Sequence, residues 1–316
     1  MTYRYIRKTP LGEVASSDSP IFEEEVEWLS PFLKNRFFTL PVDFPLNSHE
    51  LFKSGKIVGM DAASVAAVWA LQVGPDHSCL DLCCAPGMKL SLIADLCGES
   101  RVVGTDINEH RLDVCYNLLT KLGYSELKKN IYQVRGEEVV PFETVRNNRK
   151  RRNKQKRQKV AVQNPLETLF DSVLVDTECS HDGSARHVNK HDNGFWAQQG
   201  SDKNRQKYSN ETELEALIDL QKQLIKKGFL RLKSGGVMVY STCSLQSKQN
   251  EEIVDYLLSE FPDSACGGKL PFACTNDDSP EGLPIVPAKR VNQHSCLFHP
   301  ESSGTSGQFI AVVSRL

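Results

Sequence analysis

The stretch "SCLDLCCAPGMKLSLIADLCG", residues 78–98, runs from an apolar segment through a Pro-Gly turn into a helix-length segment that ends at Gly98. The apolar segment has the length of a buried strand, and the residues after Gly87 repeat their apolar positions at helical spacing. A strand that turns at once into a helix is the unit of parallel α/β sheets. This stretch therefore predicts an α/β fold.

Further units of the same kind follow along the chain. Strand-like apolar runs lie at residues 101–107, 130–136, 170–176 and 236–241, and two last strands are expected near 296–300 and 307–316. Helix-length amphipathic segments at 108–123, 211–232 and 250–261 separate or follow these runs. Connections of this length between parallel strands are almost always right-handed crossovers. We therefore expect a Rossmann-like, doubly wound, mostly parallel sheet with an antiparallel edge at its C-terminal end.

The regions outside this alternation set the expected domain organisation. Residues 1–50 predict a short, helical N-terminal extension, and residues 51–316 predict one α/β domain. Within that domain the run "RNNRKRRNKQKRQK" at 146–159 has nine basic residues and no acid. Such a run cannot bury apolar surface, so we expect a disordered basic insertion at 146–164. Pro, Gly and Asp residues predict an irregular excursion at 266–287.

Composition and charge are those of an ordinary globular protein. The chain is 40% hydrophobic and 25% charged, with a formal net charge of -2. No apolar run approaches the roughly 18 to 20 residues of a membrane span. The N-terminus lacks the apolar core of a signal peptide, which argues against secretion. We expect a monomer that does not enter membranes.

The ten cysteines do not form a spaced framework. Most lie in apolar runs or beside glycine, which is typical of reduced, buried thiols. Cys179, His181, His187 and His191 lie close enough in the sequence to raise the alternative of a zinc site, but no CxxC pair occurs. Because this spacing matches none of the usual ligand patterns, we expect no metal and favour loop histidines that meet solvent or a polyanion.

The turn at residues 84–88 has the position of a cofactor site. Ligands of doubly wound folds bind at the carboxyl ends of the strands, and Asp106 follows the turn by about the 20 residues typical of a ribose-binding acid. The pattern GxGxxG is absent, which argues against a dinucleotide. S-adenosylmethionine, which has no phosphate, fits such a turn better. A tight turn without any ligand is the alternative at this point.

Two cysteines follow strands elsewhere in the chain. "SVLVDTECSHDGSAR", residues 172–186, carries Asp176 and Cys179 just past an apolar run, and "GVMVYSTCSLQ", residues 236–246, carries Cys243. Carbon 5 of a pyrimidine becomes nucleophilic only after a thiolate adds to carbon 6, and an acid on the base edge favours that addition. The two strand ends therefore suggest methylation of a pyrimidine.

Four segments in this order resemble the cytosine-5 RNA methyltransferases of the Nop2/Sun (RsmB-like) family. They are "LDLCCAPGMKLS", "VVGTDINEHRL", "VLVDTECSHDG" and "GVMVYSTCSLQSKQNEEIV", and together they cover about 200 residues. The segment at 55–71 is also similar to the helix that precedes the first strand in that family. The resemblance implies an enzyme that uses S-adenosylmethionine to make 5-methylcytosine in RNA, with tRNA or rRNA as substrate.

The resemblance also implies roles for individual residues. Cys243 matches the nucleophile, Cys179 the cysteine linked to release of the covalent product, and Asp176 the acid that contacts the base, with Lys89 as a fourth catalytic residue. The implied cofactor site comprises Cys83, Cys84, Ala85, Pro86, Gly87, Met88, Lys89, Asp106, Arg111 and Asp176.

Several positions depart from the family pattern. Glu178 stands where the family has a proline, and a carboxylate there is expected to raise the pKa of Cys179. Met88 replaces a glycine of the turn, Met60 replaces a glutamine, and the acid near the adenine has no clear counterpart around Gly136. Most of the N-terminal RNA-binding part of many members is missing. A non-catalytic member that binds RNA or a protein, and a small-molecule methyltransferase, are therefore the alternatives.

The basic run has two functional interpretations. Arg149, Lys150, Arg151 and Arg152 are expected to contact RNA phosphates. The run is also typical of a nuclear or nucleolar address, while cytoplasmic and organellar locations stay open. A solvated loop without a partner is the third interpretation.

Overall fold

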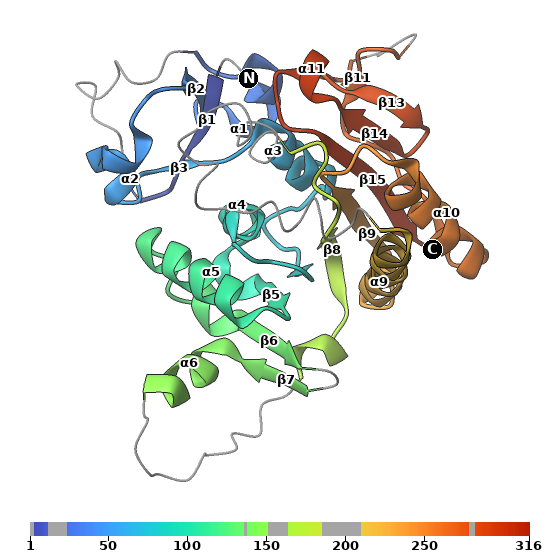
Figure 1. Cartoon of the computed structure of the whole chain (residues 1–316), viewed down its shortest axis with the longest axis horizontal. Coiled ribbons are helices and arrows are strands. Elements are labelled where there is room, and N and C mark those ends of the chain that lie inside the picture. Colours follow the sequence, from blue (N-terminus) through green and yellow to red (C-terminus); the bar gives the residue numbers. More distant parts are fainter. Residues whose placement is uncertain (1–2, 12–23, 136–137, 151–163, 185–209, 278–281) are drawn as a thin grey trace.

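The computed structural model describes residues 3–11, 24–135, 138–150, 164–184, 210–277 and 282–316 (Figure 1). Its centre is a ten-stranded sheet with the order β13-β14-β15-β9-β8-β4-β5-β6-β7, in which β10 also pairs with β15. Five strands are parallel: β4 (Cys79–Asp81), β5 (Val102–Asp106), β6 (Ile131–Arg135), β8 (Phe170–Asp176) and β9 (Leu232–Thr242). The predicted Rossmann-like, doubly wound α/β fold is confirmed.

Antiparallel strands extend both edges of this sheet. At the C-terminal edge these are β10 (Ala265–Gly267), β13 (Lys289–Asn292), β14 (Ser295–Phe298) and β15 (Gln308–Arg315). At the other edge β7 (Glu138–Pro141) forms a hairpin with β6. The C-terminal edge was predicted, whereas the β6–β7 hairpin was not.

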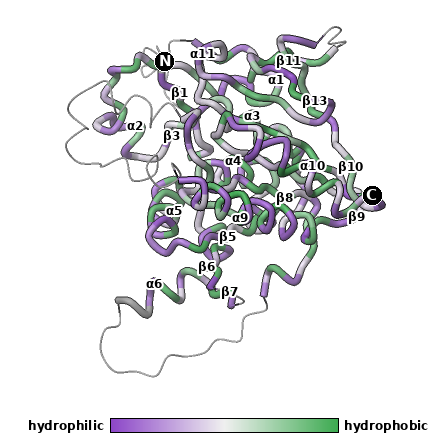
Figure 2. Tube along the Cα trace, turned by 45° about the vertical axis from the view of Figure 1, so that its right-hand side comes forward, coloured by the Kyte–Doolittle hydropathy of each residue, from purple (hydrophilic) through white to green (hydrophobic). Residues whose placement is uncertain are grey.

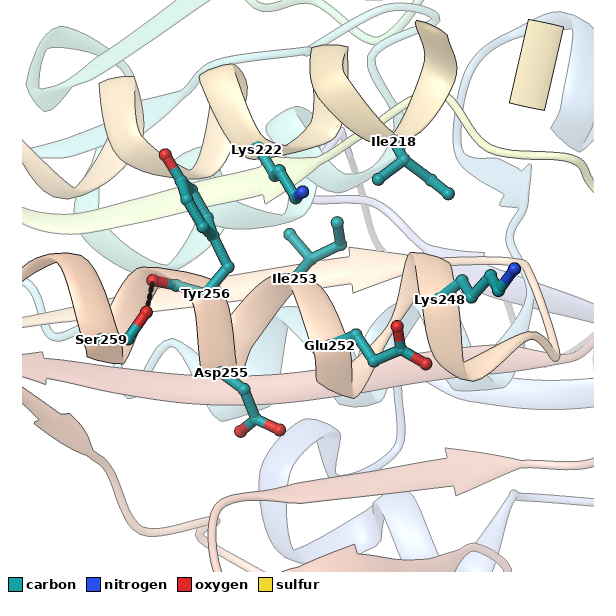
Figure 3. A pocket seen from close by; sticks show the side chains of 8 residues that line it. All are labelled: Ile218, Lys222, Lys248, Glu252, Ile253, Asp255, Tyr256 and Ser259. Atoms are coloured by element: carbon teal, nitrogen blue, oxygen red, sulfur yellow. Dashed lines mark hydrogen bonds between the residues drawn. The ribbon is translucent and has the colours of Figure 1, made fainter. Parts of the chain in front are cut away.

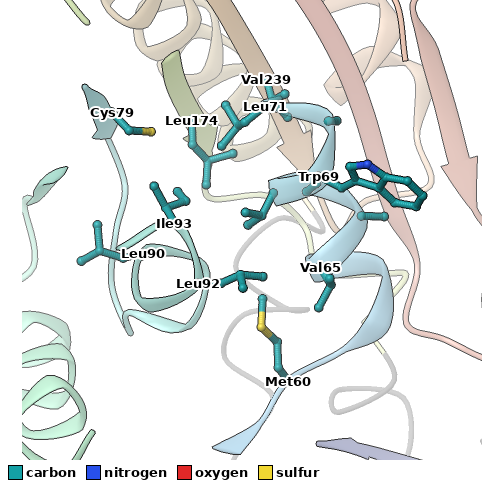
Figure 4. Close-up of a cluster of buried hydrophobic side chains, with 14 of the residues drawn as sticks. Met60, Val65, Trp69, Leu71, Cys79, Leu90, Leu92, Ile93, Leu174 and Val239 are labelled. Carbon is teal, nitrogen blue, oxygen red and sulfur yellow. The ribbon is translucent and has the colours of Figure 1, made fainter. Parts of the chain in front are cut away.

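Helices cover both faces, because successive side chains of a buried strand point to opposite sides. Leu174 and Val239 pack with α3 (Ala62–Ala70), α4 (Met88–Cys97) and α5 (Glu109–Lys121), as part of the cluster in Figure 4. Val173, Val175, Met238 and Tyr240 pack with α9 (Glu211–Phe229) and α10 (Glu251–Glu260) on the other face. Hydrophobic and hydrophilic segments alternate along α5 and α9 in Figure 2, as expected for helices with one face on a sheet.

The first fifty residues differ from the helical extension expected for them. They contribute β1 (Tyr3–Lys8) and β2 (Phe37–Pro41) to an antiparallel sheet completed by β3 (Ile57–Gly59). The α-helices that the structure describes beside it are short, α1 (Ser30–Leu33) and α2 (Glu50–Lys53). The expectation of a helical extension was wrong, because β1 and β2 pair with each other and share a separate apolar core. This sheet also crosses the boundary expected at residue 50.

A buried charge network fastens this small sheet to the main domain. Arg7, which is fully buried in β1, pairs with Asp95 of α4 and donates to Ser91 Oγ at 2.7 Å. Arg36 and the hydroxyl of Tyr124 bind the same carboxylate. Buried charges are tolerated when they are paired in this way, so the N-terminal segment has a defined position beside α4.

The two expected insertions are only partly described. Residues 146–150 are helical, since α6 spans Phe142–Lys150, so the expectation of disorder was wrong for that part. Residues 151–163 lie outside the described part of the chain. The described residues of the excursion expected at 266–287 are largely irregular but include the end of β10 and the paired strands β11 (Ala273–Cys274) and β12 (Ile285–Val286). A last short helix, α11 (Pro300–Ser303), precedes β15.

Candidate active site

The turn between β4 and α4 lies against the end of β5. Gly87 has a φ of +103°, and a side chain there would place its Cβ 2.8 Å from Cys115 Sγ. The N–H of Ala85 donates to Asp106 Oδ2 at 3.2 Å, and Arg111 donates to the carbonyl of Ala85. The structure therefore brings together the turn, Asp106 and Arg111, which were predicted to bind the cofactor. Glycine is required at position 87 by both conformation and space.

Asp81 is a second acid at this place, and the sequence analysis did not single it out. It ends β4, is 1% exposed, and its Oδ1 has no hydrogen-bond partner among the described residues. Burial, together with the charge of Asp176, raises the pKa of Asp81 to about 8. A buried acid with an unpaired oxygen is stabilised by an incoming cation, and the ammonium group of S-adenosylmethionine is one. The residues present therefore fit that cofactor.

Stability is expected to depend on pH through Asp81. An unfolded Asp81 ionises near 3.8, whereas the folded one stays protonated up to about 8. As the pH rises between these two values, the free energy of unfolding should therefore fall by about 1.4 kcal/mol per pH unit. Asp81→Asn should remove this slope, measured by denaturant unfolding at pH 5 and pH 8, while Asp263→Asn at an exposed position should keep it. Equal slopes in the wild type and Asp81→Asn would show that Asp81 does not titrate in this range.

Asp176 and Lys89 form an ion pair beside the turn. Lys89 Nζ lies 2.8 Å from Asp176 Oδ2, and Ser241 Oγ donates to Oδ1 at 2.7 Å. Burial works to lower the pKa of Lys89, but the charge and hydrogen bond of Asp176 outweigh it and raise that pKa above its usual value. The pair therefore places a cation and an anion together at the carboxyl ends of β8 and β4.

The two predicted cysteines are in direct contact. Cys179 Sγ lies 3.3 Å from Cys243 Sγ, and His181 Nδ1 lies 2.9 Å from Cys243 Sγ and 3.6 Å from Cys179 Sγ. The two sulfurs follow β8 and β9, which run parallel with Asp176 opposite Ser241 in the register. The structure thus brings Cys243, Cys179, Asp176 and Lys89 together at the carboxyl ends of the parallel strands.

The thiols behave as a pair that shares a proton. The hydrogen bond from Cys243 lowers the pKa of Cys179 to about 6, against burial and with help from His181. The same hydrogen bond and burial raise the pKa of Cys243 well above its ordinary value. The expectation that Glu178 raises the pKa of Cys179 was wrong, because the contacts with Cys243 and His181 dominate.

Cys179, His181 and Cys243 could also hold a soft metal ion. Their ligand atoms all lie within 4.8 Å of one another, and two thiolates with one imidazole are donors that zinc accepts. His187 and His191, the other residues of the zinc alternative, lie outside the described part of the chain. That the protein binds no metal stays a prediction.

The remaining predicted residues are placed less completely. Arg149 and Lys150 belong to the last turn of α6, but their side chains, like the whole of Arg151 and Arg152, lie outside what the structure describes. Gly136 lies outside it as well. Met60 is buried in the apolar cluster of Figure 4.

A separate pocket lies between α9 and α10 (Figure 3). It has a volume of about 430 Å³ and is lined mainly by charged and aliphatic side chains, among them Lys222, Lys248 and Glu252. None of the predicted site residues lines it.

Among the described residues, no helix has the length and apolar character needed to cross a membrane.

These features define a Rossmann-like, S-adenosylmethionine-dependent methyltransferase: a tight turn after the first parallel strand, an acid after the second, and paired thiols after the fourth and fifth. The chain belongs to the family described as 16S rRNA methyltransferase RsmB/F, whose model matches residues 68–312. The match covers all five parallel strands. The resemblance drawn from the sequence is therefore confirmed at the level of the family.

Individual relatives agree with this assignment. Over 186 residues the chain is 27% identical to ribosomal RNA small subunit methyltransferase F of Shewanella piezotolerans, covering 58% of this chain and 31% of the relative. Over 231 residues it is 27% identical to methyltransferase B of Citrobacter koseri, covering 72% of this chain and 45% of the relative. The chain thus spans less than half the length of these curated relatives.

Two solved structures from Pyrococcus horikoshii share the fold. A methyltransferase homolog matches with a TM-score of 0.65 at 23% identity, over 100% of this chain and 87% of its own. NSun6, solved with SFG, matches with a TM-score of 0.57 at 19% identity, over 89% of this chain and 60% of its own. At these identities the likeness shows the fold alone.

Proposed function

We propose that this protein methylates carbon 5 of cytosine in RNA through a covalent bond between Cys243 and carbon 6. The observation that carries the proposal is the contact of two thiols, 3.3 Å apart, beside the Lys89–Asp176 ion pair at the strand ends. A small-molecule methyltransferase would leave this thiol pair without a role. rRNA is the first substrate to test, because the relatives are named for it, and tRNA is the second.

The side chains divide the work of the reaction. Cys243 Sγ adds to carbon 6 of the base, which turns carbon 5 into a nucleophile. Asp176, held by Lys89 and Ser241, accepts a hydrogen bond from the amino group of the base and positions it, while the ammonium group of Lys89 stabilises the negative charge that develops during addition. S-adenosylmethionine, when bound at the turn beside Asp106, supplies the methyl group. Cys179, whose sulfur lies next to that of Cys243, accepts the carbon 5 proton, and the bond between Cys243 and carbon 6 then breaks.

Labelled cofactor tests this proposal. Protein incubated with methyl-labelled S-adenosylmethionine and total RNA should yield labelled 5-methylcytidine after digestion to nucleosides. Cofactor binding, followed separately by calorimetry, distinguishes the alternatives. Binding without any transfer would support a non-catalytic RNA- or protein-binding member, and label in small molecules alone would contradict an RNA substrate.

The basic run is proposed to bind RNA phosphates. Each lost phosphate contact should lower the slope of log affinity against log salt by roughly 0.7 for single strands. Replacing Arg149, Lys150, Arg151 and Arg152 by Ala should therefore flatten this slope by about three units, while the rate at saturating RNA stays nearly unchanged. An unaltered slope would leave either nuclear or nucleolar import or a solvated loop without a partner, and tagging the same variant in cells distinguishes these two.

A further inference from the structure

His181 has a backbone conformation that needs support from its surroundings. Its φ is +58°, in the left-handed region that residues other than glycine adopt infrequently. Such conformations cost on the order of 1 kcal/mol or more and are concentrated at functional sites. Contacts with the neighbouring loops must therefore hold His181 in this conformation.

Hydrogen bonds fasten the loop of His181 to the loop of Cys243. The N–H of Gly183 donates to the carbonyl of Cys243 at 3.0 Å, and the N–H of Leu245 donates to Asp182 at 3.1 Å. A Cβ on Gly183 would lie 2.8 Å from that carbonyl, so only glycine permits this approach. The N–H of Ser180 donates to Gln249 at 3.0 Å. These contacts fix the path of the chain on both sides of His181.

The fixed loop directs the imidazole at the thiol pair. Its Nδ1 lies 2.9 Å from Cys243 Sγ, which is nearer than its 3.6 Å to Cys179 Sγ. Burial works to lower the pKa of His181, but hydrogen bonding to Cys179 and the charges of Cys179, Glu178 and Asp176 outweigh it and raise that pKa. The charge of Glu178 thus strengthens the neutral imidazole as a proton acceptor and stabilises the imidazolium that forms when the ring takes up a proton.

We propose that His181 is the base that accepts the thiol proton of Cys243 when its sulfur adds to the cytosine. The proposal rests on the function proposed above. As the S–H bond breaks, its proton passes to Nδ1 and its electron pair forms the bond from sulfur to carbon 6. The electrons of the double bond between carbons 5 and 6 move into the ring, where the ammonium group of Lys89 stabilises the negative charge. On release the sulfur leaves carbon 6 as a thiolate and recovers its proton from the imidazolium.

The other polar groups near Cys243 are less suited to this task. Both oxygens of Asp176 already accept hydrogen bonds, from Lys89 and Ser241. Lys89 is protonated and can only donate, as its raised pKa indicates. Cys179 Sγ also lies within reach of Cys243 Sγ, at 3.3 Å, but the proposed function already assigns it to release of the product. A base must lie within hydrogen-bond distance of its proton, and His181 meets that condition at 2.9 Å from Cys243 Sγ.

Alkylation of Cys243 tests the pairing without RNA or cofactor. The variant His181→Gln keeps a polar side chain of similar size but cannot take up a proton. The rate of reaction with iodoacetamide is followed from pH 5 to pH 9 by mass spectrometry of the peptide that contains Cys243. Loss of the base should move the profile to higher pH, and a profile that moves by one pH unit lowers the rate at pH 7 by about tenfold. His299→Gln, the same change before α11, should keep the wild-type profile.

Kinetics then test the role in catalysis. In His181→Gln the kcat for methylation should fall by roughly 10²- to 10⁴-fold, with little change in KM for RNA. An alkylation profile unchanged in His181→Gln would overturn the proposal. So would stoichiometric zinc that survives dialysis in the wild type and is lost in His181→Gln, because His181 would then be a ligand. A profile moved to higher pH in a protein that never methylates cytosine would support the pairing and contradict only the proposed function.

Discussion

Cys243→Ala is expected to lower methyl transfer to RNA below detection, a loss of at least about 10⁴-fold. The alanine variant cannot form the bond to carbon 6, and without that bond carbon 5 of cytosine has no nucleophilic character. Cys243 is a small, partly buried side chain that follows β9, so its truncation should change the free energy of unfolding by about 1 kcal/mol. The measurement is incorporation of labelled methyl groups into RNA, alongside a denaturant unfolding curve.

A cysteine outside the site provides the matched control. Cys266 in β10 is also a free, partly buried cysteine, and Cys266→Ala should retain the wild-type rate. Methylation by Cys243→Ala at a rate close to that of the wild type would contradict the covalent mechanism. Loss of activity in both variants would instead point to a general effect of removing thiols.

Cys179→Ala is expected to remain covalently attached to RNA. The Sγ of Cys179 is the sulfur in contact with that of Cys243, and its lowered pKa of about 6 supplies an acid–base group at neutral pH. Without it the product should leave Cys243 slowly, so turnover falls and a complex that resists denaturant accumulates. Gel electrophoresis under denaturing conditions with labelled RNA measures that complex.

The double variant identifies the bond. Cys179→Ala combined with Cys243→Ala should show no complex, because the attacking sulfur is absent. A complex that persists in the double variant would place the covalent bond on another residue. Rapid turnover by Cys179→Ala without any complex would show that release does not need this thiol.

The strands and their order were predictable because they depend on local patterns. Apolar runs such as residues 170–176 have the length of buried strands, and right-handed crossovers then determine how parallel strands follow one another. Since the carboxyl ends of parallel strands lie on the same side of a sheet, Asp176, Cys179 and Cys243 were expected to lie together, and they do.

The features that were missed depend on contacts between distant segments. β1 and β2 are separated by residues 9–36, and neither is followed, among the described residues, by a long amphipathic helix like those that follow the parallel strands. His181 was considered as a zinc ligand or as a loop histidine, and not as a partner of Cys243, because its position beside Cys243 depends on its positive φ and on the hydrogen bond from Gly183. The lowered pKa of Cys179 likewise depends on contact with the sulfur of Cys243, which lies 64 positions away in the sequence.

RNA that contains 5-fluorocytidine tests the central claim most directly. After addition of Cys243 to carbon 6 and methyl transfer, fluorine occupies the place of the proton that must leave carbon 5, so release stops. The wild type with S-adenosylmethionine should therefore form a stable complex with this RNA, and mass spectrometry should locate the bond at the peptide that contains Cys243. A wild type that methylates ordinary cytosine but forms no complex with the fluorinated RNA would contradict covalent catalysis by Cys243.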